Sequence, residues 1–324
     1  MQIGTTVPTS CTEPSLVPRE SIAEWSRRAE AAGFAGLWAL DHLVVPPTYR
    51  TSMLDPLSAL GFVAGHTSTV DLGTSILLLP LRRTATVASS AQTINHLTGG
   101  RLTLGLGAGY VEKEFEVAGV PIEERGPRLS EAIDVLKVLF AGEASFQGRF
   151  HDFDDVRIDP VTDPPPRLLA GGNSNVGDGG RTMPDPMLER ILESGGWIAP
   201  PSSPAKLEAE TEIIDAYARE RSVDPATLDR VLLSYTHLVD PDAAADPREE
   251  QRTAFEQYFS DRRGFEYAEE HALVGTVDEV LERLERYRAI GFDQVIVGPA
   301  TSDPAELPVQ MDLLSEHVLP EFGE

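Results

Sequence analysis

Short apolar runs alternate with amphipathic segments from one end of the chain to the other. The apolar runs predict eight strands, at Gln2–Val7, Gly36–Leu40, Val70–Leu79, Arg101–Leu106, Arg167–Ala170, Gly196–Ala199, Arg230–Val239 and Gln294–Val297. The clearest amphipathic segments predict helices at Glu20–Ala32, Pro56–His66, Ala85–Leu97, Leu129–Phe140, Met187–Ser194, Pro204–Arg221, Val277–Ile290 and Ala305–Leu319. Thr276 directly precedes one of these helices and is a suitable N-cap. This alternation is typical of a parallel sheet built from βα units.

Eight strands joined by helices predict an α/β fold. The simplest closed arrangement is one (β/α)8 TIM barrel, with residues 1–324 as a single domain. An open doubly wound sheet is the alternative. Such a sheet usually carries a Gly-x-Gly-x-x-Gly turn after its first strand, whereas the first strand here leads to Pro8-Thr9-Ser10-Cys11. The missing glycines therefore favour the barrel.

Two segments interrupt the regular alternation. Pro160–Pro166 is rich in proline and predicts a stiff, extended connector. Asp240–Arg263 is polar and acidic and predicts an insertion after the seventh strand. Within it, Phe255, Tyr258 and Phe259 stand at helical spacing, which favours a helix packed on the barrel over a ligand site.

The chain is strongly acidic. Its 52 acidic residues against 27 basic ones give a formal net charge of −25, and the acids are spread over the whole length. Such a surface repels the phosphates of nucleic acids and anionic membranes, so we expect neither as a partner. Lysine occurs only at positions 113, 137 and 206. A GC-rich genome would explain the preference for arginine over lysine but not the excess of acids.

We interpret the excess of acids as a halophilic feature, because high salt screens the repulsion between like charges. The expected result is a melting temperature that rises from low to multimolar salt. A thermal unfolding series across that range measures it. A melting temperature that does not rise with salt would contradict the hypothesis.

Three features bear on location and metal binding. The N-terminus, Met1-Gln2-Ile3-Gly4, lacks the basic and apolar regions of a signal peptide, and no apolar run is long enough for a membrane span. We therefore expect a cytoplasmic protein. The single cysteine, Cys11, excludes an intrachain disulfide and a multi-cysteine metal site. The seven histidines contain no His-x-His pair, so we expect no metal site.

The run Gly36–His42 ends abruptly in Asp41-His42, directly after the second predicted strand. Active sites of parallel barrels lie at the C-terminal ends of the strands. Imidazole is also the side chain best suited to proton transfer near neutral pH. Asp41 and His42 are therefore candidate catalytic residues, with a capping Asp and a structural His as the alternative.

Two glycine-rich stretches end neighbouring predicted strands. Gly105-x-Gly107-x-Gly109 closes the fourth strand and removes side chains where a flat or anionic group could approach the backbone. Gly171-Gly172-Asn173-Ser174 closes the fifth strand. The backbone amides of Gly171, Gly172 and Asn173, with the Ser174 hydroxyl, are suited to hold a phosphate, and a plain tight turn is the alternative.

In their order and spacing these stretches resemble the bacterial-luciferase-like family, especially its branch that uses the deazaflavin coenzyme F420. The resemblance rests on the segments Gly33–His42, Leu72–Ile76, Gly105–Phe115, Glu124–Gly126, Ala170–Ser174, Gly195–Trp197, Val274–Val280 and Gly291–Asp293. It thus extends over nearly the whole chain and implies an oxidoreductase on a TIM barrel.

The resemblance also implies roles for individual residues. Asp41-His42 matches a pair near the redox ring, where the imidazole serves in acid–base chemistry. Ser75-Ile76 matches a bulge with a non-proline cis peptide behind the middle ring of the flavin. Gly107 lies on the same rim, and Gly171, Gly172, Asn173 and Ser174 match the loop that contacts the cofactor phosphate.

The chain departs from the F420-dependent sugar-phosphate dehydrogenases directly after the fourth-strand glycines. Those enzymes place a proton-donating Glu there, whereas this chain has Tyr110. Tyr110 is therefore a third candidate catalytic residue, as a proton donor or as a wall of the pocket. Its presence and the negative charge argue against a sugar phosphate as the substrate.

Coenzyme F420 is the cofactor that the resemblance favours, with FMN as the alternative. With F420 we expect hydride transfer to or from a small organic substrate. With FMN we expect a monooxygenase supplied by a separate flavin reductase, because the chain has no dinucleotide fingerprint of its own. The sequence is also compatible with a homodimer. A member of the barrel family without a cofactor and a metal-dependent hydrolase are the rival classes, and the retained His42 and the missing metal ligands argue against them.

Overall fold

The computed structural model describes residues 1–12, 17–44, 51–177, 180–243, 246–259, 264–301 and 303–322. Eight parallel strands form a closed barrel: β1 (Gln2–Thr6), β3 (Gly36–Ala39), β5 (Asp71–Leu78), β6 (Leu102–Gly107), β9 (Arg167–Gly171), β12 (Gly196–Ala199), β13 (Asp229–Thr236) and β14 (Gln294–Pro299). Their order is β1-β14-β13-β12-β9-β6-β5-β3, and β1 pairs with both β14 and β3. The predicted TIM barrel is therefore confirmed, and the open sheet is wrong.

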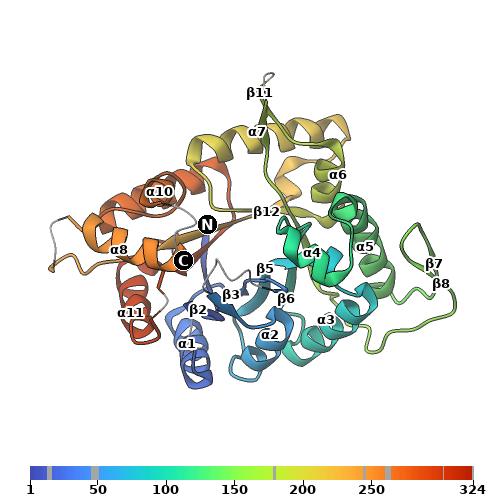
Figure 1. The fold of residues 1–324 in the computed structure, drawn as a ribbon, viewed down its shortest axis with the longest axis horizontal. Coiled ribbons are helices and arrows are strands. Elements are labelled where there is room, and N and C mark those ends of the chain that lie inside the picture. The colour runs from blue at the N-terminus through green and yellow to red at the C-terminus, as the bar shows by residue number, and fades with distance from the viewer. Residues whose placement is uncertain are drawn as a thin grey trace.

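Helices surround the strands as an outer ring (Figure 1). They are α1 (Arg19–Ala32), α2 (Pro56–Ala64), α3 (Thr84–Thr98), α4 (Glu112–Ala118), α5 (Arg125–Phe140), α6 (Asp185–Ser194), α7 (Pro204–Glu220), α8 (Arg248–Phe259), α9 (Phe265–His271), α10 (Val277–Ile290), α11 (Leu307–His317) and α12 (Leu319–Phe322). Every predicted helix is present, and Thr276 caps α10 through a reciprocal capping box with Glu279.

The predicted helix Ala305–Leu319 is shorter in the structure. It begins at Leu307, with Pro308 in its first turn, and ends at His317 before the short α12. Proline suits the first turn because its missing N–H has no helical acceptor there. Pro320 cannot donate the next helical hydrogen bond, which is one reason for the break after α11.

The loops contain short elements that periodicity did not predict. Three two-stranded ribbons pair β2 (Ser10–Thr12) with β4 (Thr51–Met53), β7 (Phe146–Gln147) with β8 (Asp152–Phe153), and β10 (Asn175–Gly177) with β11 (Gly180–Thr182). Single 3-10 turns are η2 (Leu79–Leu81), η3 (Ile122–Glu124) and η4 (Pro225–Thr227). Segments of two or three residues carry no readable hydrophobic period.

The barrel interior is filled by apolar side chains. Alternate residues of a strand point to opposite sides of the wall, and the inward set is Trp38, Leu169, Ile198, Val231, Leu233 and Ile296. Leu40, Ile76 and Tyr235 pack on this set and are half-buried, close to the C-terminal ends of β3, β5 and β13. We refer to these three side chains as the mouth floor.

The insertion after β13 supplies α8, as predicted from its aromatic spacing. Residues 244–245 and 260–263 of the insertion lie outside the described part of the chain. Phe255 and Phe259 are buried in a cluster with Phe265 of α9 and Ala300 beyond β14. The ring centroids of Tyr258 and Phe259 lie 5.4 and 5.7 Å from that of Tyr235. The prediction of a helix that packs on the barrel is thus confirmed, and this helix packs beside the mouth floor.

Candidate active site at the barrel mouth

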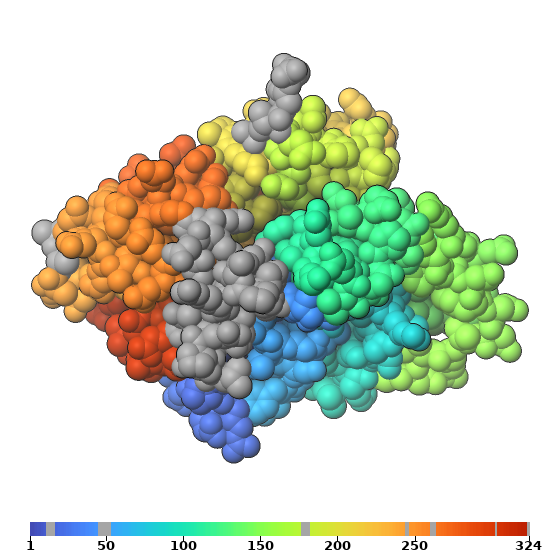
Figure 2. All heavy atoms as spheres, in the orientation of Figure 1, coloured from blue at the N-terminus to red at the C-terminus, as the bar shows by residue number. Residues whose placement is uncertain are grey.

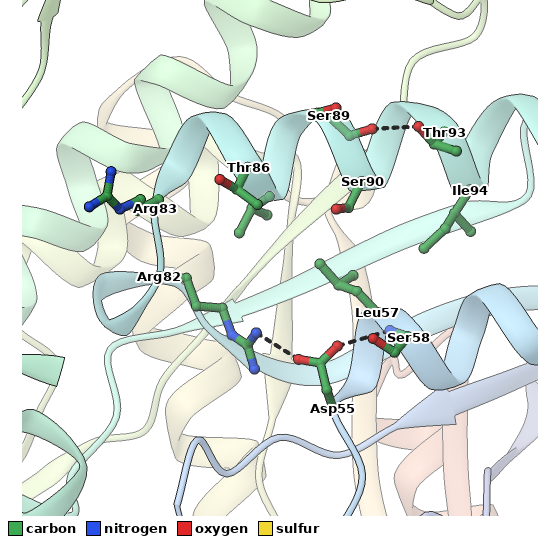
Figure 3. A pocket seen from close by; sticks show the side chains of 11 residues that line it. Asp55, Leu57, Ser58, Arg82, Arg83, Thr86, Ser89, Ser90, Thr93 and Ile94 are labelled. Carbon is green, nitrogen blue, oxygen red and sulfur yellow. Dashed lines mark hydrogen bonds and ion pairs between the residues drawn. The ribbon is translucent and has the colours of Figure 1, made fainter. Parts of the chain in front are cut away.

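Asp41 lies two residues after the end of β3, and its carboxylate is buried. It accepts hydrogen bonds from the Leu78 backbone N–H at 2.9 Å and from Nη2 of Arg82 at 2.8 Å. Arg82 also donates through Nη1 to Asp55 Oδ2 at 2.7 Å, and Asp55 caps α2 (Figure 3). Burial lowers the pKa of Arg82. Its hydrogen bonds to Asp41 and Asp55 outweigh the effect of burial, so the pKa of Arg82 is raised overall. Asp41 therefore ties the end of β3 to the end of β5.

His42 is half-buried and contacts a carboxylate that sequence reasoning did not single out. Its Nδ1 lies 3.3 Å from Oε2 of Glu114, the third residue of α4. The other oxygen of Glu114, Oε1, accepts the backbone N–H of Leu43 at 2.6 Å. Glu114 is fully buried (0% exposed). The family resemblance includes Lys113-Glu114-Phe115 and so contains Glu114. The seven-residue helix is too short for its sequence pattern to show which of its acids face the barrel.

Tyr110 lies close to His42 but is mostly exposed. The centroids of the two rings are 6.4 Å apart in an edge-on arrangement, and 64% of Tyr110 is accessible to solvent. The structure thus brings this candidate from the end of β6 to the imidazole. The role of Tyr110 as a proton donor or as a wall of the pocket stays a prediction.

Ser75 and Ile76 are joined by a cis peptide bond, as predicted from the family resemblance. The register between β5 and β6 shifts between Thr74 and Leu77, which marks the predicted bulge. Ser75 is buried, whereas Ile76 is half-buried in the mouth floor. Ile76 also packs against the cluster that holds Phe115 and Leu43, so the bulge and the His42–Glu114 pair share neighbours.

The glycines at the ends of β6 and β9 make room for this bulge. A Cβ on Gly107 would lie 1.8 Å from Cδ1 of Ile76, and a Cβ on Gly171 would lie 3.2 Å from its Cγ2. A Cβ on Gly105 would lie 2.3 Å from the carbonyl oxygen of Thr74. The sequence suggests that the fourth-strand glycines allow a ligand to approach the backbone. Protein atoms fill that space at Gly105 and Gly107, so packing alone explains these two glycines. Their part in cofactor binding stays a prediction.

The loop after β9 is held by hydrogen bonds to side chains of α7 and β12. The backbone N–H of Ser174 donates to Oε1 of the buried Glu210 in α7 at 2.6 Å, and Nζ of Lys206 lies 3.7 Å from the same oxygen. The carbonyl of Gly172 accepts the indole N–H of Trp197 at 2.9 Å. Asn173 is exposed, whereas Ser174 is buried. Among the amides of this loop, that of Ser174 is thus already bound to a carboxylate.

Viewed along the barrel, α4 lies over the strand ends (Figure 1), and its side chains occupy the visible face near the centre (Figure 2). A groove with a volume of about 620 Å³ lies elsewhere, between α2 and α3. It is lined by Arg82, Arg83 and several Ser and Thr side chains (Figure 3). Asp41, His42 and Tyr110 are not among the residues that line this groove, although Arg82 pairs there with Asp55 and, behind it, with Asp41.

Two further findings concern the described residues as a group. They contain no cluster of three or more His, Cys, Asp or Glu side chains arranged to hold a metal ion. Among their helices, none is both long and apolar enough to cross a lipid bilayer.

The chain belongs to the luciferase-like monooxygenase family, whose model matches residues 1–270. F420-dependent hydroxymycolic acid dehydrogenase of Mycobacterium tuberculosis is 32% identical over 231 residues, which cover 68% of this chain and 59% of that protein. Across several curated relatives, the matched segment spans 49% to 66% of the relative's own length. The family expected from the sequence is therefore confirmed.

Solved structures share the whole fold at low sequence identity. An F420-dependent secondary alcohol dehydrogenase, in complex with an F420–acetone adduct, superimposes with a TM-score of 0.82 at 20% identity and covers 100% of this chain and 99% of its own. The oxygenating constituent of 3,6-diketocamphane monooxygenase from Pseudomonas putida, in complex with FMN, gives a TM-score of 0.76 at 17% identity over 99% and 98%. These similarities describe the fold.

Proposed function

We propose that this chain is an oxidoreductase that binds coenzyme F420 at the barrel mouth and acts on a small organic substrate. The observation that carries the proposal is the position of His42, which lies at the C-terminal end of the barrel with a buried carboxylate on its Nδ1. Membership of the family and the F420 named for the hydroxymycolic acid dehydrogenase support it. FMN, named for the monooxygenase from Pseudomonas putida, is the alternative.

The residues present fit a flat tricyclic ring. The mouth floor offers an apolar surface from the ends of three strands, and Ile76 within it packs against the positions of Gly107 and Gly171. We infer that Ser75 and Ile76 support the ring and that the loop Gly171-Gly172-Asn173-Ser174 meets its phosphate. When bound, the deazaflavin supplies the hydride chemistry, and the protein supplies position and proton transfer.

His42 is the group suited to hold or release the proton that accompanies hydride transfer at a carbinol carbon. General acid–base catalysis needs a group that exchanges protons near neutral pH, and imidazole does so. Asp41, whose carboxylate is buried and paired with Arg82, holds the segment that carries His42 rather than touching the substrate. Tyr110, at the exposed edge of the site, is placed to contact the substrate or to donate a second hydrogen bond.

Equilibrium titration of the purified chain with F420 and, separately, with FMN tests the proposal. Binding is measured by quenching of the cofactor's fluorescence. We expect F420 to bind at least about tenfold more tightly than FMN, a difference of about 1.4 kcal/mol. The opposite order would replace the proposal by an FMN-dependent monooxygenase. Failure of the folded chain to bind either cofactor would overturn both.

A matched pair of variants locates the phosphate. Asn173→Asp places an anion on the exposed part of the loop and is expected to weaken binding, whereas Gln147→Glu adds the same charge on β7 at the periphery (Figure 1) and is the control. Gly172→Asp is a poorer probe, because a Cβ there would lie 2.2 Å from Sδ of Met187. Equal binding by both charge variants would move the phosphate away from this loop.

A further inference from the structure

Glu114 is a buried acid on a helix whose other charged residues, Glu112, Lys113 and Glu116, are exposed. Its neighbours Lys113 and Glu116 are exposed and form an ion pair with each other on the surface of α4. Glu114 and Phe115 face inward instead, and Phe115 packs with Leu78 and Leu81. A buried carboxylate is costly unless hydrogen bonds compensate it. Two polar contacts of Glu114 are made to the segment that follows β3, namely to the Leu43 N–H and to His42 Nδ1.

We propose that Glu114 is the positioning residue that sets the tautomer of His42. It holds the neutral imidazole with the proton on Nδ1, so that Nε2 is the nitrogen that accepts a proton. The assignment of the tautomer rests on the contact between the two side chains. The catalytic use of Nε2 rests on the proposed function.

The assignment of the proton follows from the hydrogen-bonding capacity of each group. An ionised carboxylate only accepts hydrogen bonds. Imidazole is in general a stronger base than a carboxylate, so in a contact of this kind the proton belongs to the nitrogen. Oε1 of Glu114 is occupied by the Leu43 N–H, and Oε2 is the oxygen that faces Nδ1. A group bonded to one ring nitrogen determines which tautomer the ring adopts.

Glu114→Gln separates this role from a structural one. Glutamine has the same shape and keeps one oxygen, which the Leu43 N–H requires as its acceptor. The side-chain NH2 then faces Nδ1 of His42 and donates to it, so the ring proton moves to Nε2. The opposite amide orientation would place the NH2 against the Leu43 N–H, with two donors facing each other. The substitution therefore keeps the loop in place and inverts the tautomer.

The experiment is ¹⁵N NMR of the histidine rings in the cofactor-free chain, at a pH at which the ring is neutral. The His42 signals are identified by their loss in His42→Ala. We expect the Nδ1–H tautomer in the parent and in Glu116→Gln, which makes the same change on the exposed side of α4, and the Nε2–H tautomer in Glu114→Gln. The Nε2–H tautomer in the parent, or the same tautomer in Glu114→Gln, would overturn the proposal. If Glu114→Gln does not fold, the parent spectrum alone decides.

Activity gives a second readout that depends on the proposed function. Substitution of the partner that orients a metal-ligating histidine typically costs roughly 10–100-fold, and we take the same order for an imidazole that transfers a proton. We therefore expect Glu114→Gln to lower kcat by that factor with little change in KM, and Glu116→Gln to change neither. An inverted tautomer with unchanged kcat would keep the positioning role and reject His42 as the proton-transfer group. Unchanged spectra would reject the positioning role itself.

Discussion

Replacing His42 by alanine is expected to lower turnover by roughly 10²–10⁴-fold while the affinity for the cofactor stays within a few-fold. General acid–base groups typically contribute a factor of that size to the rate. The apolar mouth floor and the loop after β9, which we infer to bind the cofactor, do not depend on the imidazole. Turnover is measured with an alcohol or carbonyl compound that the parent converts, and affinity by fluorescence titration.

His96→Ala is the matched control for this variant. His96 is an exposed residue in the last turn of α3, so its removal tests the loss of a histidine without touching the barrel mouth. The control should retain the parent's turnover. If His42→Ala also retains it, His42 has only a structural role, and the proton must be transferred by another group such as Tyr110.

Arg82→Met should lower the free energy of unfolding by about 3–5 kcal/mol, the usual cost of removing one partner of a buried ion pair. The carboxylate of Asp41 is fully buried and would keep only the Leu78 N–H as its hydrogen-bond donor among the described contacts. Methionine retains much of the apolar stem of arginine, so the lost charge is the main change. Chemical denaturation measures the effect.

The neighbouring residue provides the control. Arg83 is exposed at the start of α3, and Arg83→Met should change the free energy of unfolding by less than about 0.5 kcal/mol. The double variant Asp41→Asn, Arg82→Met should be less destabilised than Arg82→Met alone, because no buried charge is left without a partner. Equal stability of the Arg82 and Arg83 variants would contradict the view that this pair anchors the segment before His42.

The barrel was predictable because its elements are long enough to show a period. Each of the eight strand predictions overlaps an observed strand, and the boundaries of α10 agree exactly with the prediction. Strands of the barrel wall are buried on both sides and are therefore apolar runs, whereas the helices are buried on one face and are amphipathic. Each of these patterns lies within a single element and can be read from its own sequence. The differences lie at element ends, where proline and capping geometry decide, as at Leu307.

Resemblance of motifs, rather than periodicity, led to the cis peptide at Ser75-Ile76. Nothing in the chemistry of serine and isoleucine favours a cis bond, and the prediction rested on the match of Leu72–Ile76 to a family bulge. The glycines of β6 and β9 stood out in the sequence because they are clustered at strand ends. The packing reason for them is that Ile76 occupies the space of their missing side chains, and only the arrangement of the three neighbouring strands shows this.

The sequence by itself determined the barrel, the family and the presence of Asp41, His42 and Tyr110 at strand ends. Only the tertiary structure distinguished their contacts. It pairs Asp41 with Arg82, and it brings Glu114 to His42 across 72 positions of the chain. Hydrogen bonds between residues so far apart depend on how helices and strands pack, and a seven-residue helix such as α4 does not reveal from its own pattern which acid it buries.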